Sequence, residues 1–301
     1  MKSVEVALRR LIGRENTLSV VWDTLLEIWG VDSIPKDLDG FYRDKEIESC
    51  RLEETLEQTY FEAYQELLNS AAVHETSPWA GKEDRLTVIV DAMSVREACL
   101  LSPILEGQGY RVESLSFSLS ALPSHTEAFA RRHFNMGQPT QISRRQGIFV
   151  SPPGHAVPQF PPYDLRFVWL RYPDRGLHAT ILSPSEVFGK TSQYILEIMR
   201  NSGRSAFMLT SDHGYIYAES ADHAFPIAQS VQTAMRKVFG GSRYVQGPKD
   251  ASATVCEKTL FVGDTLLVRG RYLWRQRDKR YFHGGLSFVE CLVPVIKAKA
   301  K

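Results

Sequence analysis

Short apolar runs alternate with helical segments from residue 86 onward, and this alternation constrains the fold of the chain strongly. Strands are expected at 88–90, 111–117, 167–171 and 205–209, and helices at 95–105, 127–134, 185–200 and 227–238. Strands that alternate with helices are typical of βαβ units, whose sheets are mainly parallel. The sequence therefore predicts an α/β fold with a largely parallel sheet that is flanked by helices.

Residues 1–80 differ from the rest of the chain in pattern and in charge. Apolar residues recur there at helical spacing, as at Val21, Leu25 and Trp29, which predicts an N-terminal helical region. This region carries 8 Lys/Arg against 16 Asp/Glu, and the remainder carries 28 against 19. We expect an acidic helical region over 1–80 and a basic domain over 86–301, joined by a linker. A basic domain fits a polyanionic substrate, while the acidic face is most simply explained by contact with solvent.

Composition excludes several classes of protein. No apolar run approaches the roughly 20 residues that span a bilayer, and the first residues lack the apolar core of a signal peptide. The four cysteines are scattered without a CxxC pair, which argues against disulfides and against a zinc site with thiolate ligands. We therefore expect a cytoplasmic protein that does not enter the membrane.

Metal-ligand residues follow several of the expected strands. The carboxyl ends of parallel strands meet at one edge of a sheet, so these side chains are expected to gather there and hold two metal ions. Carboxylate and imidazole ligands without thiolates suit zinc, with manganese as the alternative. A second Asp-His pair, Asp222-His223, follows no apolar strand and is expected to be a polar pair at a helix start. The expected ligands are Asp91, Asp174, His178, Asp212, His213 and His283.

A candidate nucleophile lies where the helix near Glu127 begins. Ser124 and Thr126 both carry hydroxyls there, and the amino end of a helix favours an anion such as an alkoxide or a phosphoryl oxygen. A hydroxyl bound to a divalent metal loses its proton more easily, as metal-bound water does. The alternative is that one of these residues merely caps the helix. His125 either contacts the substrate or makes an orienting hydrogen bond.

The order of these motifs resembles the alkaline phosphatase superfamily, especially its phosphodiesterase-like members. Within it, Val90-Asp91-Ala92, Leu122-Pro123-Ser124-His125-Thr126 and His283-Gly284-Gly285-Leu286-Ser287 resemble the PglZ domain over about residues 86–297. Many PglZ relatives carry Arg and Glu soon after the first Asp. Here Arg96 and Glu97 are displaced from that position, which puts a substrate role for them in doubt.

The resemblance implies an alkaline-phosphatase-like core, two metal ions and a threonine nucleophile. Thr126 would attack phosphorus and form a phosphothreonine that water then hydrolyses. PglZ proteins occur in phage-defence and signalling systems of bacteria, which implies such a role here by analogy. One ion would be held by Asp91, Thr126, Asp212 and His213, and the other by Asp174, His178 and His283.

Residues 269–281 combine six cations with aromatic side chains directly before His283. Cations with aromatic platforms suit the backbone and bases of nucleic acids, so Trp274, Arg275 and Arg277 are candidates for substrate binding. The alternative is a solvated β-hairpin whose aromatic residues pack inward.

Together these features predict a metal-dependent phosphoesterase, with a phosphodiester such as a nucleotide or oligonucleotide as its substrate. The rival interpretation is a catalytically weak or inactive PglZ scaffold that binds a protein partner through residues 1–80. The full set of seven ligand-type residues argues against the scaffold, because a protein without catalysis need not keep them.

Overall fold

The computed structural model describes residues 2–13, 16–73, 77–80, 84–142, 147–151, 165–178, 182–247, 251–274 and 279–301, with residues 2 and 3 described by their backbone alone. The helices are α1 (Lys2–Ile12), α2 (Thr17–Trp29), α3 (Leu38–Thr59), α4 (Glu62–Ala72), α5 (Val95–Gly107), α6 (Thr126–Phe134), α7 (Pro139–Ile142), α8 (Tyr172–His178), α9 (Pro184–Asn201), η1 (Ala221–His223), α10 (Gln229–Phe239), α11 (Ala253–Cys256) and α12 (Phe288–Cys291). The strands are β1 (Leu86–Val90), β2 (Tyr110–Leu119), β3 (Ile148–Val150), β4 (Phe167–Leu170), β5 (Ala206–Thr210), β6 (Ile216–Tyr217), β7 (Tyr244–Gln246), β8 (Thr259–Val262), β9 (Thr265–Val268), β10 (Tyr281–Phe282) and β11 (Leu292–Ala300).

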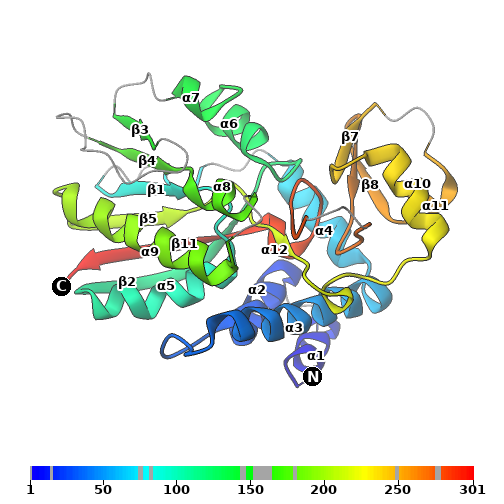
Figure 1. Cartoon of the computed structure of the whole chain (residues 1–301), viewed down its shortest axis with the longest axis horizontal. Helices are drawn as coiled ribbons and strands as arrows, with labels where there is room; N and C mark the ends of the chain where they lie inside the picture. The colour runs from blue at the N-terminus through cyan, green and yellow to red at the C-terminus, as the bar shows by residue number, and fades with distance from the viewer. Residues whose placement is uncertain are drawn as a thin grey trace.

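A six-stranded sheet with the order β2-β11-β5-β1-β4-β3 forms the centre of the molecule (Figure 1). β1 pairs in parallel with β4 and β5, and β3 pairs in parallel with β4. β11 runs antiparallel to both of its neighbours, β2 and β5. The predicted α/β fold is therefore confirmed, and the sheet is mixed because one late strand is inserted against the direction of the others.

Alternating side chains of β1 and β4 explain why helices cover both faces of this sheet. Ile89 and Trp169 point to one face, where Phe129 of α6 packs against Trp169 with ring centroids 5.5 Å apart. Val88 and Leu170 point to the other face and join the main hydrophobic core. A strand buried on both faces consists almost wholly of apolar residues, as the sequence of β1 does.

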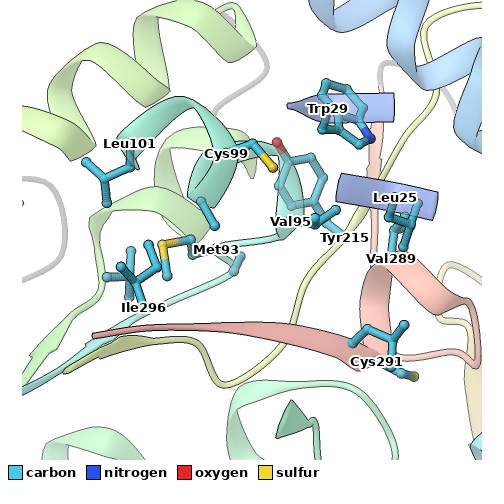
Figure 2. Close-up of a cluster of buried hydrophobic side chains, with 14 of the residues drawn as sticks. Leu25, Trp29, Met93, Val95, Cys99, Leu101, Tyr215, Val289, Cys291 and Ile296 are labelled. Atoms are coloured by element: carbon cyan, nitrogen blue, oxygen red, sulfur yellow. The ribbon is translucent and has the colours of Figure 1, made fainter. Parts of the chain in front are cut away.

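The N-terminal helices pack directly on the α/β part of the molecule. Figure 2 shows Leu25 and Trp29 of α2 close to Tyr215 and Val289, which belong to the later part of the chain. These side chains are nearly or fully buried and belong to one continuous hydrophobic cluster. Residues 1–80 are helical as expected, and their apolar faces complete the core around the sheet. None of the helices in the described ranges is both long and apolar enough to cross a lipid bilayer.

Buried ion pairs also join α3 to the basic part of the chain. Glu46 accepts hydrogen bonds from Arg96 at 2.7 Å and from Arg271 at 2.6 Å, and Glu53 accepts one from Arg271 at 2.9 Å. Burial opposes the ionisation of Glu46, but the two arginines outweigh it and lower the pKa of Glu46 to about 2. Part of the opposite charge of the two regions is thus neutralised inside the molecule. Arg96 is thus held inside the molecule by its contacts with Glu46.

A smaller unit lies beside the main sheet (Figure 1). It consists of the antiparallel sheet β7-β9-β8 together with α10 and α11, around a separate apolar cluster. Trp274 is buried in this cluster, where its Nε1 donates to the Gly240 carbonyl at 2.8 Å and its ring packs on Phe239. Since Trp274 serves the fold here, its position gives no support to a role in substrate binding.

Candidate metal centre

The expected ligands come together where three neighbouring parallel strands end. Asp91 follows β1, Asp212 and His213 follow β5, and Asp174 lies in α8, which follows β4. The order β5-β1-β4 makes these strands neighbours in the sheet, so their carboxyl ends lie at the same edge. This is the edge at which open α/β sheets usually carry their sites.

The first group of side chains surrounds the hydroxyl of Thr126. Its Oγ1 donates to Asp91 Oδ1 at 3.3 Å and lies 3.3 Å from His213 Nε2. His213 Nε2 also lies 3.6 Å from Asp91 Oδ1 and 3.8 Å from Asp212 Oδ2. Asp91, Asp212 and His213 are buried, whereas Thr126 is partly exposed. His213 Nε2 is thus the common neighbour of Thr126, Asp91 and Asp212.

Backbone hydrogen bonds leave the expected metal-binding atoms of this group free. His213 Nδ1 lies 2.9 Å from the Gly214 carbonyl, which can only accept, so Nδ1 carries a proton and Nε2 is the ring nitrogen that faces the cluster. Asp212 Oδ1 accepts from the N–H groups of Ala92 and His213 at 3.1 and 3.0 Å. Asp212 Oδ2 is buried without a partner in the described structure. A bound cation is the simplest partner for such an oxygen.

The second group contains the side chains of Asp174, His178 and His283. The Nε2 atoms of the two histidines lie 3.0 Å apart, and Asp174 Oδ1 lies 3.2 Å from His178 Nε2 and 3.6 Å from His283 Nε2. The two groups adjoin, because the rings of His213 and His283 stack with centroids 4.4 Å apart. Ligand atoms of Asp91, Asp174 and His213 also lie within 4.8 Å of one another. The structure thus forms two trios of possible metal ligands that share Asp174, with Thr126 and Asp212 beside them.

The electrostatics of the cluster favour bound cations. Burial and the charges of Asp212 and Asp174 raise the pKa of Asp91 well above its usual range. Burial and the neighbouring His213 lower the pKa of His283 to about 3, so this imidazole is neutral and can act as a ligand. Buried carboxylates that repel one another and neutral imidazoles are the ligands that zinc and manganese bind. The residues present therefore fit divalent metal ions.

Close packing explains the glycine that follows the Asp-His pair. A Cβ atom at Gly214 would lie 2.0 Å from the Val289 carbonyl oxygen. The Gly214 N–H donates to the Glu290 carbonyl at 2.9 Å, which fixes the loop after β5 against α12. Only a residue without a side chain allows this approach, so Gly214 helps to hold Asp212 and His213 in place.

The two hydroxyls before and at the start of α6 have different surroundings. Ser124 is buried, and its Oγ donates to the Gly285 carbonyl at 2.8 Å and accepts from the Gly284 N–H at 3.0 Å. Its hydroxyl therefore fixes the loop that carries His283. Thr126 Oγ1 instead faces Asp91 and His213, at 3.3 Å from each.

Replacing Ser124 by alanine should loosen this loop rather than remove the nucleophile. The Gly284 N–H and the Gly285 carbonyl would lose their partner, which should lower the free energy of unfolding by about 1–3 kcal/mol. Urea unfolding and phosphoesterase assays of Ser124→Ala measure the two effects. Activity should fall less than in Thr126→Ala, and a larger loss in Ser124→Ala would identify Ser124 as the nucleophile instead.

His125 and the first part of the basic-aromatic segment, residues 269–274, lie within the fold, whereas Arg280 near its end is exposed. His125 Nδ1 lies 2.9 Å from Glu127 Oε2 and 3.3 Å from the Ala128 nitrogen at the start of α6, and its ring stacks on Tyr244 with centroids 4.8 Å apart. The sequence left two roles open for His125, contact with the substrate or an orienting hydrogen bond, and this geometry fits the second. Arg269 pairs with Glu57 and, like Arg271, is buried. Two further candidates for substrate binding lie outside the described residues, namely Arg275 and Arg277.

A separate cavity of about 870 Å³ lies between α3 and the segment around η1. Apolar side chains such as Phe225 and charged ones such as Arg51 and Lys279 line it. It includes none of the seven candidate ligands, so it is distinct from the metal centre.

Sequence reasoning overlooked one charged residue at this sheet edge. Arg171 follows β4 directly and lies near enough to Asp91 to act on its charge. Its position at a strand end, like that of Asp91, was the signal that could have identified it.

Comparison with solved structures finds a distant similarity to phosphonoacetate hydrolase from Sinorhizobium meliloti 1021. The complex with phosphonoacetate matches at 15% identity and a TM-score of 0.29, covering 71% of this chain and 65% of the hydrolase. The complex with phosphonoformate matches at 14% identity and the same TM-score of 0.29. The chain thus spans slightly less than two thirds of the hydrolase. Neither protein-family models nor curated protein sequences give a match.

Proposed function

We propose that this protein is a metal-dependent phosphoesterase that uses Thr126 as its nucleophile. The position of Thr126 Oγ1, 3.3 Å from both Asp91 Oδ1 and His213 Nε2, carries the proposal. Asp91, Thr126, Asp212 and His213 would hold one divalent ion, and Asp174, His178 and His283 the other. When bound, the ions supply positive charge that acidifies the hydroxyl and offsets the charge of a phosphoryl group.

The chain itself supplies the nucleophile and positions it. Thr126 is the first residue of α6, where backbone N–H groups and the helix dipole favour an anion. Its oxygen would bond to phosphorus while the ester oxygen leaves with the electron pair of the broken bond. The hydroxyl proton faces Asp91 Oδ1, which can accept it. Water would then cleave the phosphothreonine and restore the hydroxyl.

The motif order supports assignment to the PglZ branch of the alkaline phosphatase superfamily, and with it a role in phage defence. A phosphodiester of nucleotide or oligonucleotide type is the substrate class we favour. Arg269 and Arg271 give this choice no support, because both are engaged by glutamates of α3. A nucleic-acid substrate therefore stays a prediction, which an assay on an oligonucleotide tests directly.

Removal of metal should abolish activity. Purified protein is expected to contain two divalent ions, and EDTA should stop hydrolysis of both nitrophenyl phosphate and bis-nitrophenyl phosphate until zinc or manganese is restored. Elemental analysis and the two assays together measure metal content and the preference for monoesters or diesters. A metal-free preparation with full activity would contradict the proposal.

The chain offers a matched control for this experiment. Asp212→Ala should lower metal content and activity together, because Asp212 Oδ2 has a buried position beside His213 Nε2. Asp222→Ala changes the same dipeptide, Asp-His, at an exposed position in η1 and should leave both unchanged. Equal metal content in the two variants would show that Asp212 is not a ligand.

A further inference from the structure

Arg171 lies at the sheet edge that carries the metal centre. β4 pairs with β1 so that Leu170 stands opposite Val90, which brings the next residues, Arg171 and Asp91, side by side. The Asp91 N–H donates to the Leu170 carbonyl at 2.9 Å, and the Arg171 N–H donates to Ser151 Oγ at 3.0 Å. Arg171 is therefore fixed at its backbone beside a residue that contacts Thr126.

Arg171 is partly exposed, and its side chain lacks the protein partners that the fully buried arginines of this chain have. Its Nε atom is buried without a hydrogen-bond partner, and its guanidinium group makes no hydrogen bond or ion pair within the described residues. The fully buried Arg96, Arg243 and Arg271 each bind at least one glutamate. Leaving a buried N–H of a charged group unpaired is costly, so this N–H needs a partner such as an ordered water or a bound anion.

We infer that Arg171 binds nonbridging oxygens of the phosphoryl group that Thr126 attacks, an inference that rests on the proposed function. A guanidinium group presents its N–H donors in a planar fork that matches two oxygens of a phosphoryl group. The three carboxylates of the site, Asp91, Asp174 and Asp212, would offset most of the charge of two bound divalent ions. Arg171 supplies a permanent positive charge from the protein at the same edge.

Binding of inorganic phosphate to the zinc-loaded protein tests this inference directly. Arg171→Ala should weaken phosphate binding about 10- to 100-fold in titration calorimetry, because a charge-assisted pair of hydrogen bonds is lost. Arg171→Lys keeps the charge without the fork and should give a smaller loss. Arg166→Ala is the matched control, since Arg166 is an exposed arginine just before the opposite end of β4. It should bind phosphate as the unchanged protein does.

The kinetics of nitrophenyl phosphate ester hydrolysis provide a second measurement. It tests for rescue, which a purely structural role of Arg171 would not show. Free guanidinium ion should restore part of the activity that Arg171→Ala loses, while having no such effect on Thr126→Ala. Metal content and thermal unfolding, measured in parallel, should match the unchanged protein. If Arg171→Ala does not fold, Arg171→Lys provides the same comparison in phosphate binding.

The outcomes separate this inference from the proposed function. If Arg171→Ala binds phosphate and hydrolyses phosphate esters as Arg166→Ala does, the inference is overturned. The proposed function then still stands. Binding of phosphate that depends on Arg171, in a protein that hydrolyses no phosphate ester, would support the anion site and refute the function.

Discussion

Thr126→Ala is expected to lower the turnover of phosphate esters by at least about a thousandfold, as loss of a catalytic nucleophile does in other hydrolases. The hydroxyl oxygen at 3.3 Å from His213 Nε2 would be lost, and the remaining alanine side chain can neither attack phosphorus nor bind a metal. Steady-state kinetics with nitrophenyl phosphate and bis-nitrophenyl phosphate measure the loss. Thermal unfolding should change little, because Thr126 is partly exposed.

Two further variants make this result specific to the hydroxyl. Thr126→Ser keeps the oxygen and should retain measurable activity. Ser124→Ala removes the neighbouring hydroxyl and should lose less turnover of phosphate esters than Thr126→Ala does. An Ala variant at position 126 that kept a tenth or more of the activity would show that another group attacks the substrate.

Arg271→Met is expected to lower the free energy of unfolding by about 3–5 kcal/mol, because removing one partner of a buried ion pair leaves uncompensated charge. Arg271 is fully buried and binds both Glu46 and Glu53. These glutamates belong to α3, so the helix should be held less firmly against the rest of the molecule. Urea unfolding measures the change.

A surface ion pair provides the control for this prediction. Arg280 pairs with Glu219 at 3.2 Å, with side chains 52% and 36% exposed, and exposed pairs contribute at most about 1 kcal/mol. Arg280→Met should therefore have a small effect. Combining Arg271→Met with Glu53→Gln should recover part of the lost stability, since it removes one of the unpaired carboxylates. Similar losses in Arg271→Met and Arg280→Met would contradict the importance of the buried network.

Local sequence patterns predicted the N-terminal helices, the other long helices and four strands of the central sheet, but not the short elements or how all the strands pair. β1 and β4 were predicted because apolar residues cluster in short runs, and α5 and α9 because such residues recur at helical spacing. The place of β11 could not be predicted in this way. Its partners β2 and β5 lie far away in the sequence, and their pairing depends on contacts that no local pattern records.

The gathering of the expected ligands followed from a general property of parallel sheets, that neighbouring strands end at one edge. The roles of single polar residues did not follow from it. Ser124 contacts a loop about 160 residues later, and a serine at the start of a helix looks the same in sequence whatever it binds. Arg269 and Arg271 likewise resemble solvent-exposed cations until the glutamates of α3 are placed beside them.

The insertion of β11 between β2 and β5 has a consequence for the order in which the chain can fold during synthesis. β2 pairs with no other described strand of the central sheet, so its edge stays open until residues 292–300 have left the ribosome. The loop with His283 and helix α12 lead directly into β11. Long-range pairing of this kind is slow to form and exposes strand edges meanwhile. The second metal group should therefore assemble in the same late step that closes the sheet, which couples metal loading to completion of the fold.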